Sequence, residues 1–244
     1  AQDDTVPSRS MKLYTREWGT GDRYAVLVHG VMSDSRNWRR VGPVLAERGY
    51  HVVAVDLRGH GHSPRAAEYT ADLMAEDILE TVPYAPELVM GHSLGGLTVS
   101  LAVDRLHPER AVYVDPAFSC PAAGWLQLKL APAFLRTLAR QSAAKIAKRN
   151  PRWDPIDVAI ERETFESFHR AAIPSVLAPS VMRAPEHLAV PSLVMLADNS
   201  YLVKPHVADH LRATGFDVRV VAGSGHVINR DDHDGFMRAL DGWI

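Results

Sequence analysis

The chain contains a serine in a setting that could make it a nucleophile. Ser93 lies at the centre of residues 91–95, Gly-His-Ser-Leu-Gly, directly after an apolar run and before a helical pattern. A strand, a very tight turn and a helix would place this serine at an apex whose sparsely allowed backbone requires small residues two positions before and after it. Gly91 and Gly95 meet that requirement. Glycine and serine are common, however, so the motif needs partners elsewhere in the chain.

A serine hydroxyl becomes nucleophilic when a base removes its proton, an acid orients the base and N–H donors hold the oxyanion. His226 lies in a glycine-rich stretch, residues 222–227, that joins an expected strand to the last expected helix. Asp115 ends an earlier apolar run, and Asp198 follows a later one. Either aspartate gives the chain order serine, acid, histidine, which is the order expected when a nucleophile turn lies in an α/β sheet.

Strand-like and helix-like segments alternate along most of the chain. Apolar runs typical of buried strands occupy 24–28, 51–55, 87–90, 111–114, 192–196 and 217–221, and 11–18 is typical of an N-terminal strand or hairpin arm. Helical spacing is found at 38–48, 70–79, 94–106, 205–214 and 231–240. The alternation predicts an α/β fold whose mostly parallel sheet carries helices on both faces. Ligands of such sheets bind beyond the carboxyl ends of the strands, where the serine, the histidine and both aspartates are expected.

One segment interrupts the alternation. Residues 118–187 contain no convincing strand, and prolines divide them into helix-like pieces. We therefore predict a helical lid at 118–187, inserted into a core formed by 1–117 and 188–244. Between 118 and 153 there is no Asp or Glu, whereas the basic residues there are Lys129, Arg136, Arg140, Lys145, Lys148, Arg149 and Arg152. A solvated helix face would explain them, and the alternative is an anionic acyl substrate, such as one held on phosphopantetheine or a carrier protein.

Composition limits the classes of function. A length of 244 residues fits one domain, and 46% hydrophobic with 23% charged residues is ordinary for a globular protein. A net charge of −2 gives no general attraction to nucleic acid or to an anionic membrane, and no apolar run is long enough to span a bilayer. The polar start, residues 1–4, has no signal-peptide pattern, so the expected location is the cytoplasm.

No metal or cofactor is expected. Cys120 is the only cysteine, which rules out an internal disulfide and makes a thiolate zinc site implausible. His206 and His210 have the spacing of a helical metal pair, but no third ligand is evident.

Four motifs occur together in an order that is highly specific for one fold. They are residues 27–30 (Leu-Val-His-Gly), 56–63 (Asp-Leu-Arg-Gly-His-Gly-His-Ser), 91–95 and 223–226 (Gly-Ser-Gly-His). The chain resembles the α/β-hydrolase superfamily, as a serine esterase-like or lipase-like member with a helical lid, over nearly its whole length outside the lid. The resemblance implies an eight-stranded type of sheet. Asp56, Arg58, His60 and His62 are expected to hold the turn after their strand.

The same resemblance implies roles for individual residues. Ser93 would be the nucleophile and His226 the general base. The oxyanion hole would consist of the backbone N–H groups of Leu94 and Val31, with Met32 as the alternative to Val31. Expected pocket residues are His29, His92, Trp125 and Leu126.

The triad acid departs from the superfamily pattern. Similar chains carry it after the strand matching 190–196, three residues beyond a glycine. Here Ala197 replaces that glycine, and Ser200 stands at the usual position of the acid. Asp198 lies earlier in the same loop, whereas Asp115 ends the preceding strand, from which haloalkane dehalogenases among others take their acid. The choice stays open, with Asp115 preferred because Asp198 would need a shifted loop path.

The implied function is a cofactor-free serine hydrolase that cleaves a small-molecule ester, thioester or lactone through an acyl-enzyme. One alternative is a ligand-binding or slow-turnover member of the fold, which the uncertain acid would favour. Another is a different use of the triad, such as C–C cleavage, acyl transfer or perhydrolysis.

Overall fold

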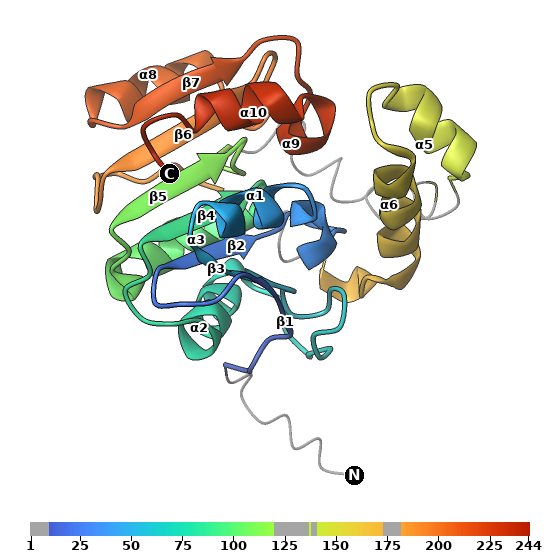
Figure 1. The fold of residues 1–244 in the computed structure, drawn as a ribbon, viewed down its shortest axis with the longest axis horizontal. Helices are drawn as coiled ribbons and strands as arrows, with labels where there is room; N and C mark the ends of the chain where they lie inside the picture. The colour runs from blue at the N-terminus through green and yellow to red at the C-terminus, as the bar shows by residue number, and fades with distance from the viewer. Residues whose placement is uncertain (1–9, 120–136, 138–140, 173–181) are drawn as a thin grey trace.

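The computed structural model of the chain describes residues 10–119, 137, 141–172 and 182–244 (Figure 1). Within these ranges seven strands form one sheet, in the order β1-β3-β2-β4-β5-β6-β7. The strands are β1 (Thr15–Trp18), β2 (Tyr24–Val28), β3 (His51–Val55), β4 (Leu88–His92), β5 (Arg110–Val114), β6 (Ser192–Ala197) and β7 (Asp217–Val221). β1 pairs with β3 in antiparallel orientation, and every other pairing is parallel. The predicted α/β class with a mostly parallel sheet is confirmed.

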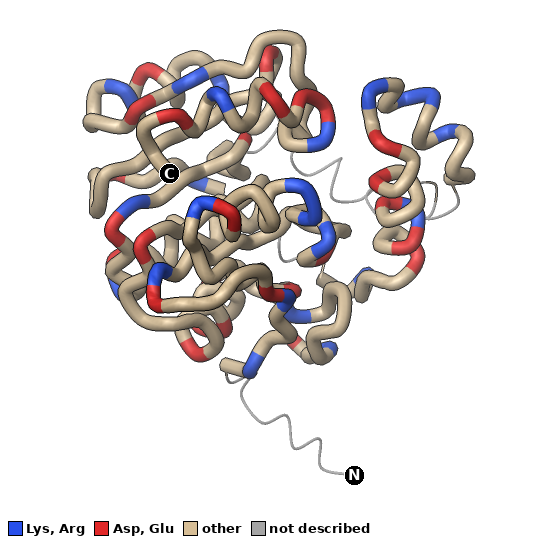
Figure 2. The backbone as a smooth tube through the Cα atoms, in the orientation of Figure 1, with Lys and Arg blue, Asp and Glu red and all other residues tan. Residues whose placement is uncertain are grey.

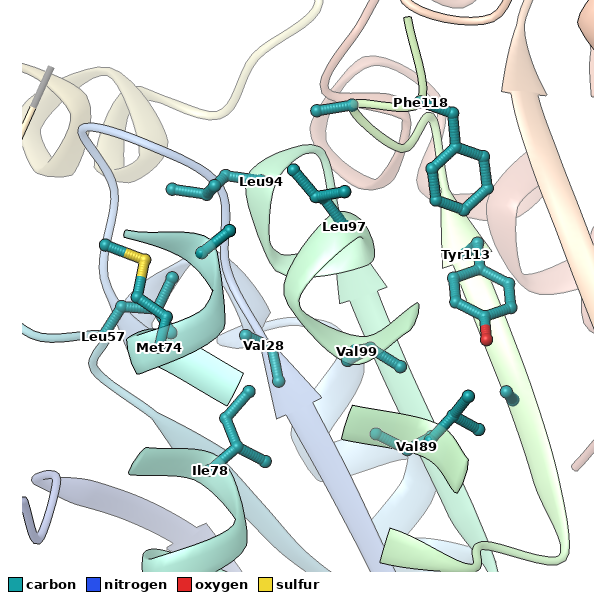
Figure 3. Packing of buried hydrophobic residues seen from close by; sticks show 14 of the residues in the cluster. Val28, Leu57, Met74, Ile78, Val89, Leu94, Leu97, Val99, Tyr113 and Phe118 are labelled. Carbon is teal, nitrogen blue, oxygen red and sulfur yellow. The ribbon is translucent and has the colours of Figure 1, made fainter. Parts of the chain in front are cut away.

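Helices cover both faces of this sheet. They are η1 (Ser35–Trp38), α1 (Val41–Glu47), α2 (Ala71–Thr81), α3 (Leu94–Leu106), α8 (Pro205–Ala213), α9 (Ile228–Asp231) and α10 (His233–Ala239). Side chains alternate between the faces along each strand, as the period of two requires. In β2, Val26 and Val28 join an apolar cluster with α2, α3 and α8, whereas Ala25 and Leu27 join a second cluster with α1 and α10. Figure 3 shows the first cluster, in which Met74 and Ile78 of α2 lie over Val28.

The N-terminal strand is shorter than predicted. The described part of the arm before Thr15 forms no strand, because its backbone N–H groups bond to side chains. Met11 N donates to Asp77 Oδ1 at 2.8 Å, and Tyr14 N donates to Ser63 Oγ at 2.8 Å. Seven strands are therefore described where the resemblance implied the eight-stranded type.

Two predicted helices begin later than their patterns indicated. Within 38–48 the helix is α1, since Trp38 is the last residue of η1, and within 231–240 it is α10, since Asp231 is the last residue of α9. Asp232 separates α9 from α10, because its backbone is not helical (φ −147°, ψ 83°) and its side chain accepts the N–H of Gly235 at 2.9 Å. A residue that caps one helix in this way ends the helix before it.

The described part of 118–187 is helical. It contains α5 (Ala143–Arg149), α6 (Pro155–Ser167) and the short η2 (Arg170–Ala172), and no strand. Figure 1 shows α5 and α6 beyond the carboxyl ends of the parallel strands. The role of this insertion as a lid, and its boundaries, stay predictions. Among the helices that the structure describes, none has the length and apolar character needed to cross a membrane.

Candidate active site

The turn between β4 and α3 holds Ser93 in an unusual backbone conformation, with φ 54° and ψ −118°. A Cβ atom added to Gly91 would overlap the Gly95 carbonyl, and one added to Gly95 would overlap the carbonyl oxygens of Val28 and His29. Both flanking glycines are thus required by close backbone approach. The serine remains at the end of a buried strand because its N–H donates to Val114 O on β5 at 2.9 Å.

A continuous chain of hydrogen bonds runs from the serine through a histidine to a carboxylate. Nε2 of His226 lies 3.0 Å from Ser93 Oγ, and Nδ1 lies 2.6 Å from Asp115 Oδ2. An ionised carboxylate can only accept, so the Nδ1 proton donates to Asp115 and leaves Nε2 free to accept the serine proton. The structure brings together three residues that are 22 to 133 positions apart in the chain.

Asp115 is fully buried at the tip of β5. Its Oδ1 accepts the N–H of Ala197 at 3.2 Å, and its own N–H donates to Met195 O at 2.7 Å. Burial alone would raise the pKa of this carboxyl, but the hydrogen bond from His226, the charge of that histidine and the N–H of Ala197 outweigh burial and hold the pKa below its usual range. Asp115 is therefore ionised at neutral pH.

Asp198, the alternative acid, lies elsewhere. Its side chain is exposed, and its backbone N–H donates to Ser224 O at 3.1 Å. Within the described residues the carboxylate that is bonded to His226 belongs to Asp115.

The loop after β2 lies against the nucleophile turn. A Cβ atom on Gly30 would come within 3.0 Å of both the His92 Nδ1 and the Ser93 Cβ atoms. Val31 and Met32 follow directly, and Met32 has a positive φ of 61°. Leu94 is the first residue of α3, where backbone N–H groups have no acceptor within the helix. These positions fit an oxyanion hole beside Ser93, and the choice between Val31 and Met32 stays a prediction.

Residues 25–239 also match the model of a protein family, and this match decides to which family the chain belongs. The chain belongs to the alpha/beta hydrolase family. It is 27% identical to N-formylmaleamate deformylase from Pseudomonas putida over 98% of this chain and 95% of that protein. It is 31% identical to the probable esterase PIR7A of Oryza sativa subsp. indica, but that match spans only 43% of this chain and 42% of the rice protein.

Solved structures share the fold of this alpha/beta hydrolase. The enol-lactonase from Burkholderia xenovorans LB400 superimposes with a TM-score of 0.76, at 23% identity, over 95% of each chain. At such a low sequence identity, the comparison shows only that the two proteins share a fold.

The two histidines predicted to line the hydrolase pocket both bond to backbone groups. His29 is fully buried, its Nδ1 donates to Gly30 O at 2.7 Å, and its Nε2 accepts the N–H of Leu57 at 3.0 Å. These contacts hold the loop after β2, and the place of His29 in the pocket stays a prediction. His92 donates from Nε2 to the carbonyl of His226 at 2.9 Å. Burial is the main cause that lowers the pKa of His92, and repulsion from the nearby His226 is the second; together they bring this pKa to about 3. The His92 ring therefore stays neutral beside the base.

Other predicted residues have clear outcomes in this hydrolase. Trp125 and Leu126 lie outside the described residues. Asp56 accepts the N–H groups of Ser35 at 2.7 Å and of His62 at 2.8 Å, and buried Arg58 pairs with Asp77 at 2.6 Å. These bonds agree with the structural roles expected for the 56–63 motif. Among the described residues no group of three or more His, Cys, Asp or Glu could hold a metal ion.

Sequence reasoning missed two neighbours of the histidine. The ring of Tyr201 lies 5.2 Å from that of His226, and burial raises the pKa of Tyr201 to about 12 although half of its surface is exposed. Asp231 accepts the N–H of Gly225, the residue before His226, at 2.9 Å. The only sequence signal that could have placed Tyr201 near the histidine is its position in the loop after a strand. Asp231 has no such signal, because its position fits an ordinary residue in the first turn of a helix.

Proposed function

We propose that the protein is a serine hydrolase that cleaves a carboxylic ester, thioester or lactone through an acyl-enzyme. The observation that carries the proposal is the hydrogen-bond chain from Ser93 Oγ to His226 Nε2 at 3.0 Å and from His226 Nδ1 to Asp115 Oδ2 at 2.6 Å. These distances lie within the range at which a general base can remove a serine proton.

In the proposed reaction, Ser93 Oγ attacks the carbonyl carbon while His226 Nε2 takes the hydroxyl proton. The oxyanion is held by the N–H of Leu94 and by that of Val31 or Met32. When the tetrahedral intermediate collapses, the bond to the leaving oxygen or sulfur breaks and His226 returns the proton to it. Water then attacks the acyl-enzyme with His226 as base, which releases the carboxylic acid and restores Ser93. Asp115 stays ionised throughout and stabilises the imidazolium.

An oriented acid favours this enzyme over a ligand-binding member of the fold. Loss of the acid alone costs on the order of 10⁴ in kcat, so a chain without one could bind a ligand and barely react. Here Asp115 is buried, is expected to be ionised and is bonded to His226. This arrangement supports the hydrolase over the ligand-binding alternative.

An N-formyl amide is a second candidate substrate class. It is suggested by the relative that matches 98% of the chain, whose name is N-formylmaleamate deformylase. The same serine and histidine would serve, with a nitrogen as the leaving atom that accepts the proton from His226.

The test combines covalent labelling with a substrate panel. The panel holds p-nitrophenyl acetate, butyrate and octanoate, an acyl thioester, a lactone and an N-formyl amide. We expect a fluorophosphonate to label Ser93 and at least one substrate to be turned over, with both signals absent from Ser93→Ala. Ser100→Ala in α3, whose hydroxyl bonds to Leu97 O, is the matched serine control. Labelling that persists in Ser93→Ala, or an unlabelled and inactive wild type, overturns the proposal.

The surface of α5 supports an anionic or carrier-bound acyl substrate. Lys145, Lys148 and Arg149 are exposed there, and Figure 2 shows this helix rich in basic residues. Exposed Arg152 donates to Gly223 O in the loop that carries His226, so the basic surface adjoins the catalytic loop.

Charge neutralisation tests the anionic substrate. The variant Lys148→Gln/Arg149→Gln is expected to raise KM severalfold for a negatively charged ester and to leave KM for a neutral ester of equal length unchanged. Arg105→Gln, exposed at the far end of α3, is the control. Equal changes for both esters would exclude charge recognition at this surface.

A further inference from the structure

His92 directly precedes the candidate nucleophile, and its side chain contacts the backbone of the candidate base. It is the last residue of β4, so Ser93 begins the turn that follows. Its Nε2 lies 2.9 Å from the carbonyl oxygen of His226, which is 134 positions later in the chain. The two imidazole rings pack with their centroids 4.7 Å apart. One side chain thus joins the nucleophile turn to the loop that carries the base.

The contacts of the His92 ring define which of its nitrogens carries the proton. A carbonyl oxygen can only accept, so Nε2 is the nitrogen that donates. Nδ1 is buried and has no hydrogen-bond partner among the described residues. The backbone of Gly30 packs against this nitrogen, since an added Cβ there would lie 3.0 Å from it. A second proton on Nδ1 would place an unpaired charge in the interior, which is costly. We therefore assign His92 as a neutral ring protonated at Nε2.

The backbone of the base needs such an anchor. The ring of His226 bonds to the serine and to the acid, and both bonds require its backbone to lie at the right distance from them. Glycines at 223 and 225 give the loop wide backbone freedom. Within the described residues, the hydrogen bond on the backbone of His226 itself is the one from His92. The 3.0 Å distance from His226 Nε2 to Ser93 Oγ therefore depends on this bond.

We propose that His92 is a positioning residue of the candidate site, whose Nε2–H fixes the backbone of His226 so that the base meets Ser93. This inference rests on the proposed function, because it assigns an anchor to the general base. A neutral ring suits this place, because His226 becomes positively charged when it takes the serine proton. A second charged ring, with its centroid 4.7 Å away, would oppose that charge.

A purely structural histidine would behave differently. If the bond only stabilised the fold, its loss would lower the free energy of unfolding and the folded fraction, and every substrate would be affected equally. A displaced base instead weakens proton transfer, which different leaving groups need to different extents. The p-nitrophenolate ion leaves without a proton, whereas the alkoxide of an alkyl ester needs one from His226.

Two esters with one acyl group separate the two roles. His92→Phe keeps a ring but loses the donor, and it is expected to lower kcat on the p-nitrophenyl ester about fivefold, with KM unchanged. The loss of kcat on the ethyl ester is expected to be greater than this by about threefold or more, because its leaving group needs the proton. Equal losses on the two esters, or an unchanged kcat on both, overturn the inference.

Two further variants serve as controls. The amide nitrogen of His92→Gln can donate from a position close to that of Nε2, so this variant is expected to recover most of the activity that His92→Phe loses. His60→Phe is the matched control, because it loses an equally buried bond, 3.0 Å long, to the carbonyl of Arg58. It is expected to lower stability in urea without changing the ratio of the two ester activities. A folded His92→Gln variant no more active than His92→Phe contradicts the positioning role.

Substrate-free NMR distinguishes failure of this inference from failure of the proposed function. Ring-nitrogen spectra of the wild type at neutral pH are expected to show His92 protonated at Nε2 alone, with its signals assigned by their loss in His92→Gln. A His92 ring protonated at Nδ1 overturns the positioning role, whether or not the protein is active. A wild type that turns over esters, with kcat unchanged by His92→Phe, overturns the positioning role alone. A wild type that is inactive and unlabelled, yet has His92 in the expected form, overturns the proposed function alone.

Discussion

The indole Nε1 of Trp153 donates a 2.8 Å hydrogen bond to Oδ1 of Asp231. Oδ2 of the same carboxylate accepts the N–H of Gly225 at 2.9 Å, so one side chain joins the helical insertion to the residue before His226. The preceding residue, Arg230, is buried, lies 4.9 Å from the Trp153 ring and donates to Glu161 of α6 at 2.7 Å. The position of the candidate base thus depends on how the insertion packs against α9.

Removing the Trp153 donor is expected to lower activity without unfolding the protein. Trp153→Phe keeps a ring beside Arg230 but loses the bond to Asp231. One hydrogen bond contributes about 1 kcal/mol, and if this contribution positions His226, its loss lowers kcat about fivefold. The measurement is kcat on the best ester of the panel, alongside urea denaturation. Asp234→Asn, at an exposed aspartate of α10, is the control. A stability loss with unchanged kcat would show that the bond is only structural.

The two candidate acids are expected to differ sharply. Asp115→Asn should reduce kcat by about 10⁴, because the amide cannot fix the imidazole tautomer that the serine requires. Asp198→Asn should change kcat less than twofold, because this exposed side chain is not the one bonded to His226. Steady-state kinetics of both purified variants are the measurement. A comparable loss in both would contradict the assignment of Asp115.

Acid should destabilise the protein partly through His60. Burial is the main cause that lowers the pKa of His60, and repulsion from the nearby His29 is the second; together they bring this pKa to about 3 in the folded protein. In the unfolded chain the pKa of a histidine is near 6.5. The unfolded state therefore binds a proton between these values that the folded state does not. The contribution of His60 is complete above pH 6.5 and is lost progressively as the pH falls toward 3.

His60→Phe tests this linkage while keeping a ring beside Phe168, whose centroid lies 6.0 Å away. The slope of unfolding free energy against pH, measured by urea denaturation between pH 4 and 6, should fall by up to about 1.4 kcal/mol per pH unit. Part of the slope should remain, because the buried His92 titrates in the same sense. An unchanged slope would mean that His60 is charged in the folded state.

Glycine 95 is expected to tolerate no side chain. Gly95→Ala would force its Cβ onto the carbonyl oxygens of Val28 and His29, which belong to a rigid buried strand end. We expect loss of soluble folded protein, or destabilisation of several kcal/mol with loss of labelling at Ser93. Gly242→Ala is the control, since nothing lies within 4 Å of its added Cβ and only its positive φ opposes the change. Folded and active Gly95→Ala would contradict the turn geometry.

Sequence patterns predicted the sheet and the pairing of Ser93 with His226 because both follow from short-range signals. Short continuous apolar runs marked the buried strands, and glycines marked the nucleophile turn and the histidine loop. Since parallel strands end at one edge, residues that follow strands were expected to converge there.

The acid could not be chosen in the same way, because Asp115 and Asp198 both follow strands that end beside the histidine loop. What decides between them is the path of the loop after β6, which leaves the Asp198 side chain exposed, whereas Asp115 bonds to His226. The orientation of the His29 ring could not be predicted for a related reason. A strand-end position predicts closeness to the site, but the direction of the ring depends on the Leu57 N–H, which belongs to another strand's loop.

Three positions at the site, Met32, Ser93 and Asp115, have positive φ values of 61°, 54° and 40°. Side chains larger than glycine rarely adopt this region, and each such residue costs about 1–3 kcal/mol unless its neighbours compensate. Chemistry and folding therefore make opposing demands on the same three residues. A Ser93→Gly protein should be inert and yet harder to unfold, which makes resistance to heat a misleading guide when improved variants of this hydrolase are sought.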